Sequence, residues 1–257
     1  MRRIMFVFAF IFLAISLFGC KKKEELLDEH ITPIEQIETN KENVTIRKET
    51  KEKKTDTIEI DGLGSVTFIT STSSSPENVQ KGSLAKGDTV IVGDYKYVFC
   101  KVFDGKEFVE TEDIGFSVIA NEKRETYKQP YTTLFGIKVL YADYCYYQND
   151  ILTEANILPI KIKSASHCFD GCINLTDKNL SEIISVLKNI EDISYMFANC
   201  KKIEIIGFDN SSIKDMNGTF LNCVNLKTIT KTPSNVMEKE DCFTGCSLLD
   251  EEMYHID

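Results

Sequence analysis

Cysteine and histidine are the most reactive side chains of this chain, and its cysteines recur at a regular spacing. The chain holds nine cysteines and three histidines. Four cysteines follow a phenylalanine by three residues, in the segments 169–172, 197–200, 220–223 and 243–246. Cysteine thiolates attack electrophiles, bind zinc and form disulfides. The spacing therefore admits three chemical interpretations besides a purely structural one.

The chemical interpretations are weak. Structural zinc sites favour cysteine pairs separated by two residues, whereas Cys168 and Cys172 are separated by three. His167 precedes Cys168 directly, but neighbouring residues of an extended segment point to opposite faces and cannot form a catalytic dyad. Cys145 and Cys168 fall on adjacent repeats, so either a disulfide or two buried free thiols is open there. We predict no catalytic residue, metal site or cofactor, and a protein that is not an enzyme.

A structural period explains the spacing. The aromatic residues are 28, 23 and 23 residues apart, and a further step of 23 towards the N-terminus reaches Tyr146, with Asn149 in the cysteine slot. Apolar residues recur at three other positions of the same period. The sequence predicts a stacked ladder of aromatic residues (Tyr146, Phe169, Phe197, Phe220, Phe243) and a ladder of slot residues (Asn149, Cys172, Cys200, Cys223, Cys246).

A period of 20–29 residues with leucines and a Cys/Asn slot is typical of leucine-rich repeats. The exchange of Asn149 with cysteine fits a buried slot whose side chain satisfies the backbone, because an amide and a thiol can both donate a hydrogen bond. A nucleophile or a metal ligand would not be copied in every repeat. The slot is therefore predicted to be structural.

The residue pattern of the repeats resembles that of a known family. The segment ISYMFANCKKIEIIGFDNSSIKDMNGTFLNC is similar to BspA-like leucine-rich-repeat surface proteins, in the matching positions Met196, Phe197, Cys200, Ile203, Ile206, Ser212, Ile213, Asp215 and Met216. The resemblance covers residues 139–249. It implies an exported or surface-anchored protein that binds host, matrix or neighbouring-cell molecules, without naming the partner.

The N-terminus predicts export and a lipid anchor. Arg2 and Arg3 precede an uncharged run of 15 residues, 4–18, which is shorter than the ~20 residues of a membrane-spanning helix. The run ends in LFGC, which resembles the lipobox of bacterial lipoproteins, so residues 1–19 are predicted to be a signal peptide and Cys20 the lipid attachment site. A plain signal peptide or an uncleaved anchor is the alternative.

Residues 20–56 are predicted to be a charged, disordered tether, with a short helix around residues 24–38 as the alternative. Residues 57–138 are predicted to form a small antiparallel β-rich region, with hairpin turns at Gly93-Asp94 and Asp104-Gly105 and a loop over 73–83. Residues 139–257 are predicted to form a short leucine-rich-repeat solenoid of about five 23-residue units. Its 28-residue unit carries a five-residue insertion before Ile190. The run 180–190 is predicted to be a packed helix on the convex side, capped by Asn179, with a groove for a partner as the alternative. The fold class is thus α+β or mostly β.

The predicted function is that of a membrane-anchored surface lipoprotein that binds a host or neighbouring-cell protein or glycan. The net charge of −10 excludes an ordinary nucleic-acid-binding protein, and no small-molecule substrate is predicted. Outward positions of the short strand after each slot are the predicted ligand-facing row (Glu154, Asn156, Asp177, Asn179, Ile205, Thr228, Thr230). The alternative is a periplasmic or envelope-structural lipoprotein without an external ligand.

Overall fold

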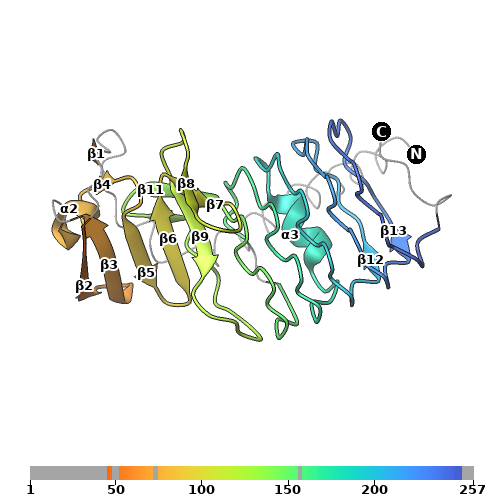
Figure 1. Ribbon diagram of the computed structural model, residues 1–257, viewed down its shortest axis with the longest axis horizontal. Helices are drawn as coiled ribbons and strands as arrows, with labels where there is room; N and C mark the ends of the chain where they lie inside the picture. The colour runs from red at the N-terminus through yellow and green to blue at the C-terminus, as the bar shows by residue number, and fades with distance from the viewer. Residues whose placement is uncertain (1–44, 48–51, 72–74, 156–157, 251–257) are drawn as a thin grey trace, which may run out of the picture. The chain divides into compact units, whose positions relative to one another are not determined.

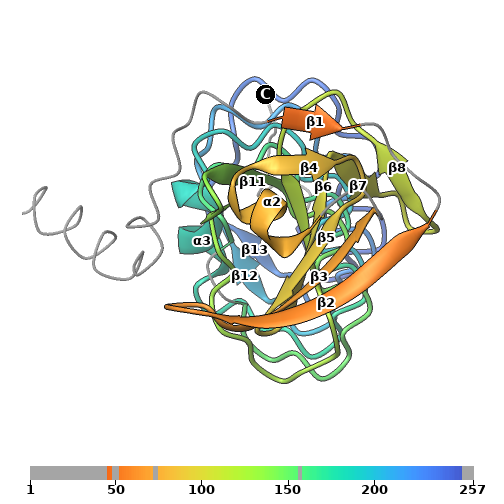
Figure 2. The same cartoon turned by 90° about the vertical axis from the view of Figure 1, so that its left-hand side faces the viewer.

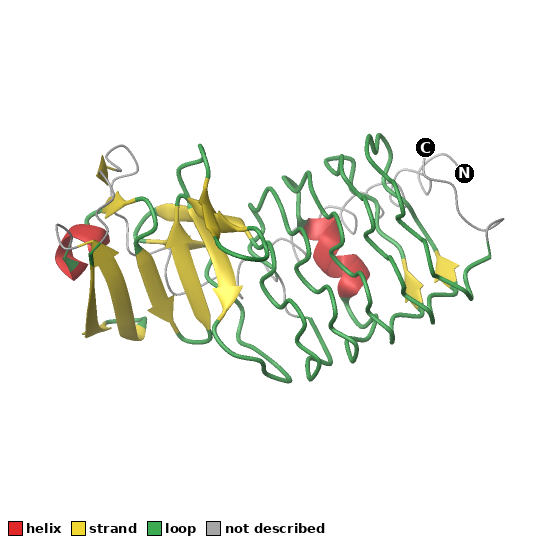
Figure 3. Cartoon of the chain, in the orientation of Figure 1, coloured by secondary structure: helices red, strands yellow, loops and turns green. Residues whose placement is uncertain are grey.

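The structure is a computed structural model that describes residues 45–47, 52–71, 75–155 and 158–250. These ranges belong to one compact unit. The predicted signal peptide, Cys20, the short helix around 24–38 and most of the predicted tether lie outside the described residues. The described chain is mostly β with few helices, which confirms the coarse fold class (Figure 3).

The N-terminal half forms a curled seven-stranded sheet in the order β10-β11-β9-β6-β5-β3-β2 (Figure 1). Its neighbouring strands are antiparallel except for the parallel pair β11 and β9. Two short pairs, β1 with β4 and β7 with β8, lie outside this sheet. The strands are β1 (Thr45–Arg47), β2 (Lys53–Ile60), β3 (Gly64–Ser71), β4 (Ser83–Ala85), β5 (Thr89–Val92), β6 (Tyr95–Phe99), β7 (Lys101–Phe103), β8 (Phe108–Glu110), β9 (Phe116–Ala120), β10 (Thr133–Leu134) and β11 (Ile137–Tyr141).

The Gly93-Asp94 hairpin turn is confirmed, because Val92 pairs directly with Tyr95 and Gly93 has a positive φ of 56°. The second hairpin is also present, but its loop is longer than predicted: Phe103 pairs with Phe108, so four residues lie between them. Asp104 stabilises this loop, since its carboxylate accepts the backbone N–H groups of Lys106 and Glu107 at 2.8 and 2.9 Å.

Two sequence assignments in this half need correction. Strand β2 begins at Lys53 and β1 lies at 45–47, so both include residues assigned to the tether. The charged start of β2 is exposed because β2 is an edge strand, and edge strands tolerate charge. The segment 73–83, predicted to be a loop, contains α2 (Pro76–Gln80). Ser75 caps this helix through its hydroxyl, which accepts the N–H of Asn78.

The C-terminal half is a series of stacked turns joined by backbone hydrogen bonds. The aromatic residue of each turn donates its N–H to the next turn: Tyr146 to the carbonyl of Cys168, Phe169 to that of Met196 and Phe197 to that of Thr219, at 2.8–2.9 Å. The turns also meet in a row of parallel backbone bridges (Tyr141, Ser164, Asp192, Asp215, Glu238). Seen end-on, the turns lie behind one another (Figure 2).

Regular secondary structure in this half is sparse. Beyond β11, the described residues of this half contain α3 (Leu180–Val186) and two short parallel strands, β12 (Ile205–Ile206) and β13 (Thr228–Ile229). The helix is where the insertion was predicted, and its Leu180, Ile183 and Ile184 are buried. Asn179 occupies the N-cap position as predicted, but it is left-handed (φ 64°) and its side chain makes no capping hydrogen bond.

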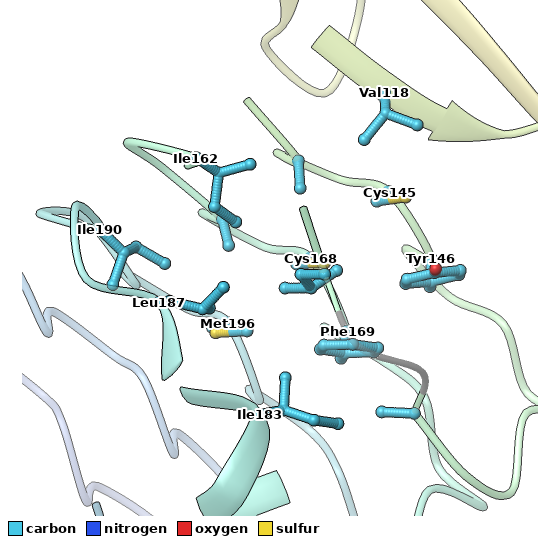
Figure 4. Close-up of a cluster of buried hydrophobic side chains, with 14 of the residues drawn as sticks. Val118, Cys145, Tyr146, Ile162, Cys168, Phe169, Ile183, Leu187, Ile190 and Met196 are labelled. Carbon is cyan, nitrogen blue, oxygen red and sulfur yellow. The ribbon is translucent and has the colours of Figure 1, made fainter. Parts of the chain in front are cut away.

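One continuous hydrophobic core runs through both halves. Figure 4 shows Val118 of β9 beside Cys145 and Tyr146 of the first turn, with Cys168 and Phe169 of the second turn and Met196 of the third below them. The junction is also polar. Tyr95 and Tyr146 share a hydrogen bond between their hydroxyls at 2.8 Å, and Ala120 donates its N–H to the carbonyl of Cys145 at 2.9 Å.

Candidate functional site

The five predicted aromatic residues form one stack through the array. Successive ring centroids, from Tyr146 to Phe243, are 5.1, 5.6, 5.7 and 5.6 Å apart, and the ring planes deviate by at most 12°. Phe169, Phe197 and Phe220 are fully or almost fully buried. Backbone bridges hold neighbouring turns about 4.8 Å apart, which places equivalent rings in contact.

The slot cysteines satisfy the backbone of the preceding turn. The Sγ atoms of Cys172, Cys200, Cys223 and Cys246 donate to the carbonyls of Tyr146, Phe169, Phe197 and Phe220, respectively, at 3.0–3.1 Å. Burial raises the pKa of the Cys172 thiol to about 12 and that of Cys246 to about 11. These thiols therefore remain protonated and able to donate at neutral pH. A thiolate nucleophile or metal ligand needs the opposite shift.

Asn149 occupies the same slot in the first turn but has different partners. No repeat precedes this turn, so its amide donates to the carbonyl of Arg124 at 2.9 Å and to the Tyr127 hydroxyl at 2.8 Å. Its Oδ1 accepts the N–H of Ile151 at 3.3 Å. The larger amide thus joins the array to the segment that leads out of the sheet.

The other four cysteines within the described ranges, Cys100, Cys145, Cys168 and Cys242, are also buried and free. The eight cysteines within the described ranges form no disulfide with one another, so Cys145 and Cys168 are neighbouring thiols. Burial and then the hydrogen bond to Cys145 raise the pKa of Cys168 well above its usual value. These two side chains lie in a column beside the aromatic stack, followed by Met196 (Figure 4).

His167 lies on the surface, away from buried Cys168. Its ring stacks between Tyr144 and Tyr195, with centroid distances of 4.6 and 4.7 Å, and its Nδ1 hydrogen-bonds to Asp170 at 2.8 Å. The sequence interpretation missed this second aromatic stack. The sequence signal was the recurrence of ring side chains two residues before the buried aromatics, at Tyr144, His167 and Tyr195. In the structure this column has positive φ in all five turns (Tyr144, His167, Tyr195, Gly218, Asp241).

The described members of the predicted ligand-facing row are at least partly exposed. Ile205 is the large apolar residue among them, at 51% exposure. Glu154 forms an ion pair with Lys178 on the next turn at 2.7 Å. Asp177 has a structural role, because its carboxylate accepts the backbone N–H of Ile205 at 3.0 Å. Asn179, Thr228 and Thr230 complete the described row, and Asn156 lies outside the described residues.

A family model for the BspA type leucine rich repeat region matches residues 141–254, with six copies. The chain carries a BspA-type leucine-rich-repeat region. The resemblance predicted from residues 139–249 is thereby confirmed, although five units were counted in the sequence. Searches of curated proteins and of solved structures returned no match.

The Asp-Met pair of the BspA-type repeat has a structural explanation here. Met216 is buried, whereas Asp215 turns outward and accepts the N–H of Asn217, two residues later, at 2.8 Å. Asp192 does the same with Ser194 at 2.8 Å, and Ser164 with Ser166 at 3.3 Å. This local turn bends the chain into each aromatic segment.

The described residues contain neither a helix that is long and apolar enough to cross a bilayer nor a group of three or more potential metal-binding side chains.

Proposed function

We propose that the chain is a bacterial surface lipoprotein, anchored at Cys20, whose array is a leucine-rich-repeat solenoid of about five units that binds a host or neighbouring-cell protein. The role is one of binding rather than catalysis. The observation that carries the proposal is the BspA-type match over residues 141–254, since that repeat is typical of exported interaction proteins.

The exposed row along β12 and β13 is the proposed contact surface. Its residues alternate with buried ones, so the core does not constrain their outward side chains. Neighbouring turns add exposed ion pairs beside it, Glu154 with Lys178 and Glu204 with Lys227, each at 2.7 Å. Exposed ion pairs contribute at most about 1 kcal/mol to folding. Breaking one to contact a partner therefore costs little stability.

The contact surface is tested by replacing Glu154, Ile205 and Thr230 together with lysine in the mature protein. Asp177 is left intact because its carboxylate holds the Ile205 backbone. The matched control carries the same three changes of residue type at exposed positions outside the array, Ile114, Glu125 and Thr126. Binding of labelled protein to intact host cells should fall at least tenfold for the row variant and remain for the control.

The same assay on trypsin-treated cells tests the class of partner. A protein partner predicts loss of binding after this treatment. Full adhesion by a correctly folded row variant, or undiminished binding to trypsin-treated cells, would contradict the proposed surface or the proposed class of partner, respectively.

The anchor is tested separately. Cys20→Ser should abolish incorporation of a labelled fatty acid and leave the precursor uncut, because the thiol that accepts the lipid is gone. Unchanged detergent partitioning and mass would contradict lipidation. Protease treatment of intact bacteria then tests the location: a surface protein is cleaved, whereas the periplasmic alternative survives.

A further inference from the structure

A groove lined by lysines lies on the flank of the array, on a chain whose net charge is −10. Its volume is about 430 Å³, and five of its lining residues are lysines against a single glutamate, Glu191. The lysines are Lys138, Lys161, Lys163, Lys188 and Lys214. An acidic protein that gathers this many cations in one hollow creates a local positive field that opposes its overall charge.

The repeat itself builds the groove. The buried column Val139, Ile162, Ile190 and Ile213 faces the core, so the residues on either side of each member point outward. Lysine stands before Val139 and before Ile162, and after Ile162 and after Ile213. Turns about 4.8 Å apart therefore present cations along a line of about 14 Å over four turns. The insertion adds Lys188 just beyond α3.

Three of the five ammonium groups have no anionic partner among the described residues. Lys163 pairs with Asp113 at 2.6 Å and Lys214 with Glu191 at 2.8 Å, whereas Lys138, Lys161 and Lys188 are exposed and form no ion pair within the described ranges. Like charges held this close repel one another, which costs folding energy that an anionic ligand would recover. The groove therefore carries more positive charge than the carboxylates of the described residues neutralise, which favours binding of an anion.

The lining chemistry narrows the class of ligand. Among the described residues, no aromatic side chain and no arginine lines the groove, so they provide none of the stacking platform with which proteins hold single-stranded nucleic acid. Ser211, Ser212 and Asn189 supply hydroxyl and amide groups between the lysines, which suit sugar hydroxyls. Lysine acts as a point charge and needs no planar, bidentate partner, so sulfate and carboxylate groups both fit.

From this geometry we propose that the groove binds a linear acidic polysaccharide, whose sulfate or carboxylate groups contact lysines on successive turns. The site is separate from the row along β12 and β13 and takes a different class of ligand. Each of the two sites can therefore fail its test without affecting the other.

The test measures binding of the full mature chain to heparin, with Lys138→Glu, Lys161→Glu and Lys188→Glu combined. The expected result is at least a tenfold loss of affinity, and a dependence of log affinity on log salt that is shallower by about 2–3. The matched control makes the same charge change outside the groove, at exposed Lys106, Lys201 and Lys202, and should keep its affinity within about twofold. Far-UV circular dichroism checks the fold of both variants.

Two results would overturn the proposal. Equal losses in the groove and control variants would mean that heparin senses only the overall charge. Tighter, groove-dependent binding of oligothymidylate or of anionic lipid vesicles than of heparin would assign the groove to nucleic acid or to a membrane surface. The groove variant should bind host-cell protein as the parent does, whichever anionic ligand the groove takes.

Discussion

The cysteine slot shows how one side chain serves as a structural donor through successive turns. Cys223 is fully buried and its thiol donates to the carbonyl of Phe197, so an amide donor can replace it. We expect Cys223→Asn to change the free energy of unfolding by less than about 1 kcal/mol. Phe220→Ala should cost about 3–5 kcal/mol, because it interrupts the buried stack. Urea denaturation followed by circular dichroism measures both, and loss of bound metal or of an activity in Cys223→Asn would contradict the structural role.

Asp143 makes the stability of the array depend on pH. Burial, with the nearby Asp192 charge, raises its pKa to about 7, despite the hydrogen bonds donated by the Ser164 hydroxyl and the Ser166 N–H. The unfolded chain has a pKa of about 3.9 there, so folding favours the protonated acid. Its contribution is full below about pH 4 and is lost as the pH rises through about 7.

The corresponding variant is Asp143→Asn, which keeps the acceptor oxygen. It should stabilise the protein by about 2–4 kcal/mol at pH 8 relative to the parent and have little effect at pH 4. Asp113→Asn is the control of opposite sign, because hydrogen bonds from Lys163 and Tyr141 lower the pKa of Asp113 and its loss costs stability above pH 4. A difference between Asp143→Asn and the parent that does not vary with pH would refute the assignment.

At the residue scale, the sequence predicts which residues form the buried columns better than it predicts the backbone conformation of the residues beside them. Apolar periodicity located the Phe and Cys columns because burial leaves a direct trace in residue type. The residue before each slot cysteine is Gly171, Asn199, Asn222 or Gly245, and all four have positive φ. That Gly/Asn preference was visible and predicts a left-handed residue. The stack around His167 was harder to predict, since non-glycine residues are uncommon at positive φ and tyrosine is not among the types enriched there.

The pairing of β12 with β13 requires a glycine at position 207, directly after β12. A Cβ atom on Gly207 would lie 1.9 Å from Oγ1 of Thr230 and 2.7 Å from the backbone N of Lys231. We expect Gly207→Ala to destabilise the protein by about 1–3 kcal/mol, because the strands would have to separate. Adding Thr230→Ala should recover part of this loss by removing the nearer atom. A Gly207→Ala protein as stable as the parent in thermal unfolding would show that the strands separate freely.

Helices and strands were predictable where a long pattern of apolar and polar residues specifies them. They were less predictable where a capping residue is the main signal. Alternation and Gly-Asp identified the β5–β6 hairpin, and the apolar face of α3 identified that helix. The five-residue α2 carries too few apolar residues to show a period, although Ser75 and Pro76 are an ordinary helix start. The tether boundary was placed too late because the charges of an edge strand resemble those of a disordered segment.

On the scale of the whole molecule, the sheet acts as the N-terminal cap of the array. Repeat arrays need a covered end, because an interior turn exposes apolar surface on both sides. Here β11 pairs with β9 in parallel, and Tyr146 packs against Tyr95 and Tyr127 with ring centroids 6.3 and 4.9 Å apart. The division of the chain into a β region and repeats, drawn from the sequence, therefore does not coincide with a break in the core.

This shared core predicts that the array does not fold properly without the sheet. A fragment of residues 139–257 loses the β9 partner of β11, exposes Cys145 and Tyr146 and removes the Arg124 and Tyr127 groups that bind Asn149. We expect residues 45–257 to unfold in one cooperative urea transition, with a steeper denaturant dependence than the fragment, since that slope scales with the surface exposed. The chain has no tryptophan, so far-UV circular dichroism and tyrosine fluorescence are the two probes. Coincident transitions are expected for the longer chain, whereas the fragment should show a broad loss of signal beginning at low urea. A fragment with a sharp transition at the midpoint of the longer chain would show that the first turn closes the array by itself and that the sheet is dispensable for its stability.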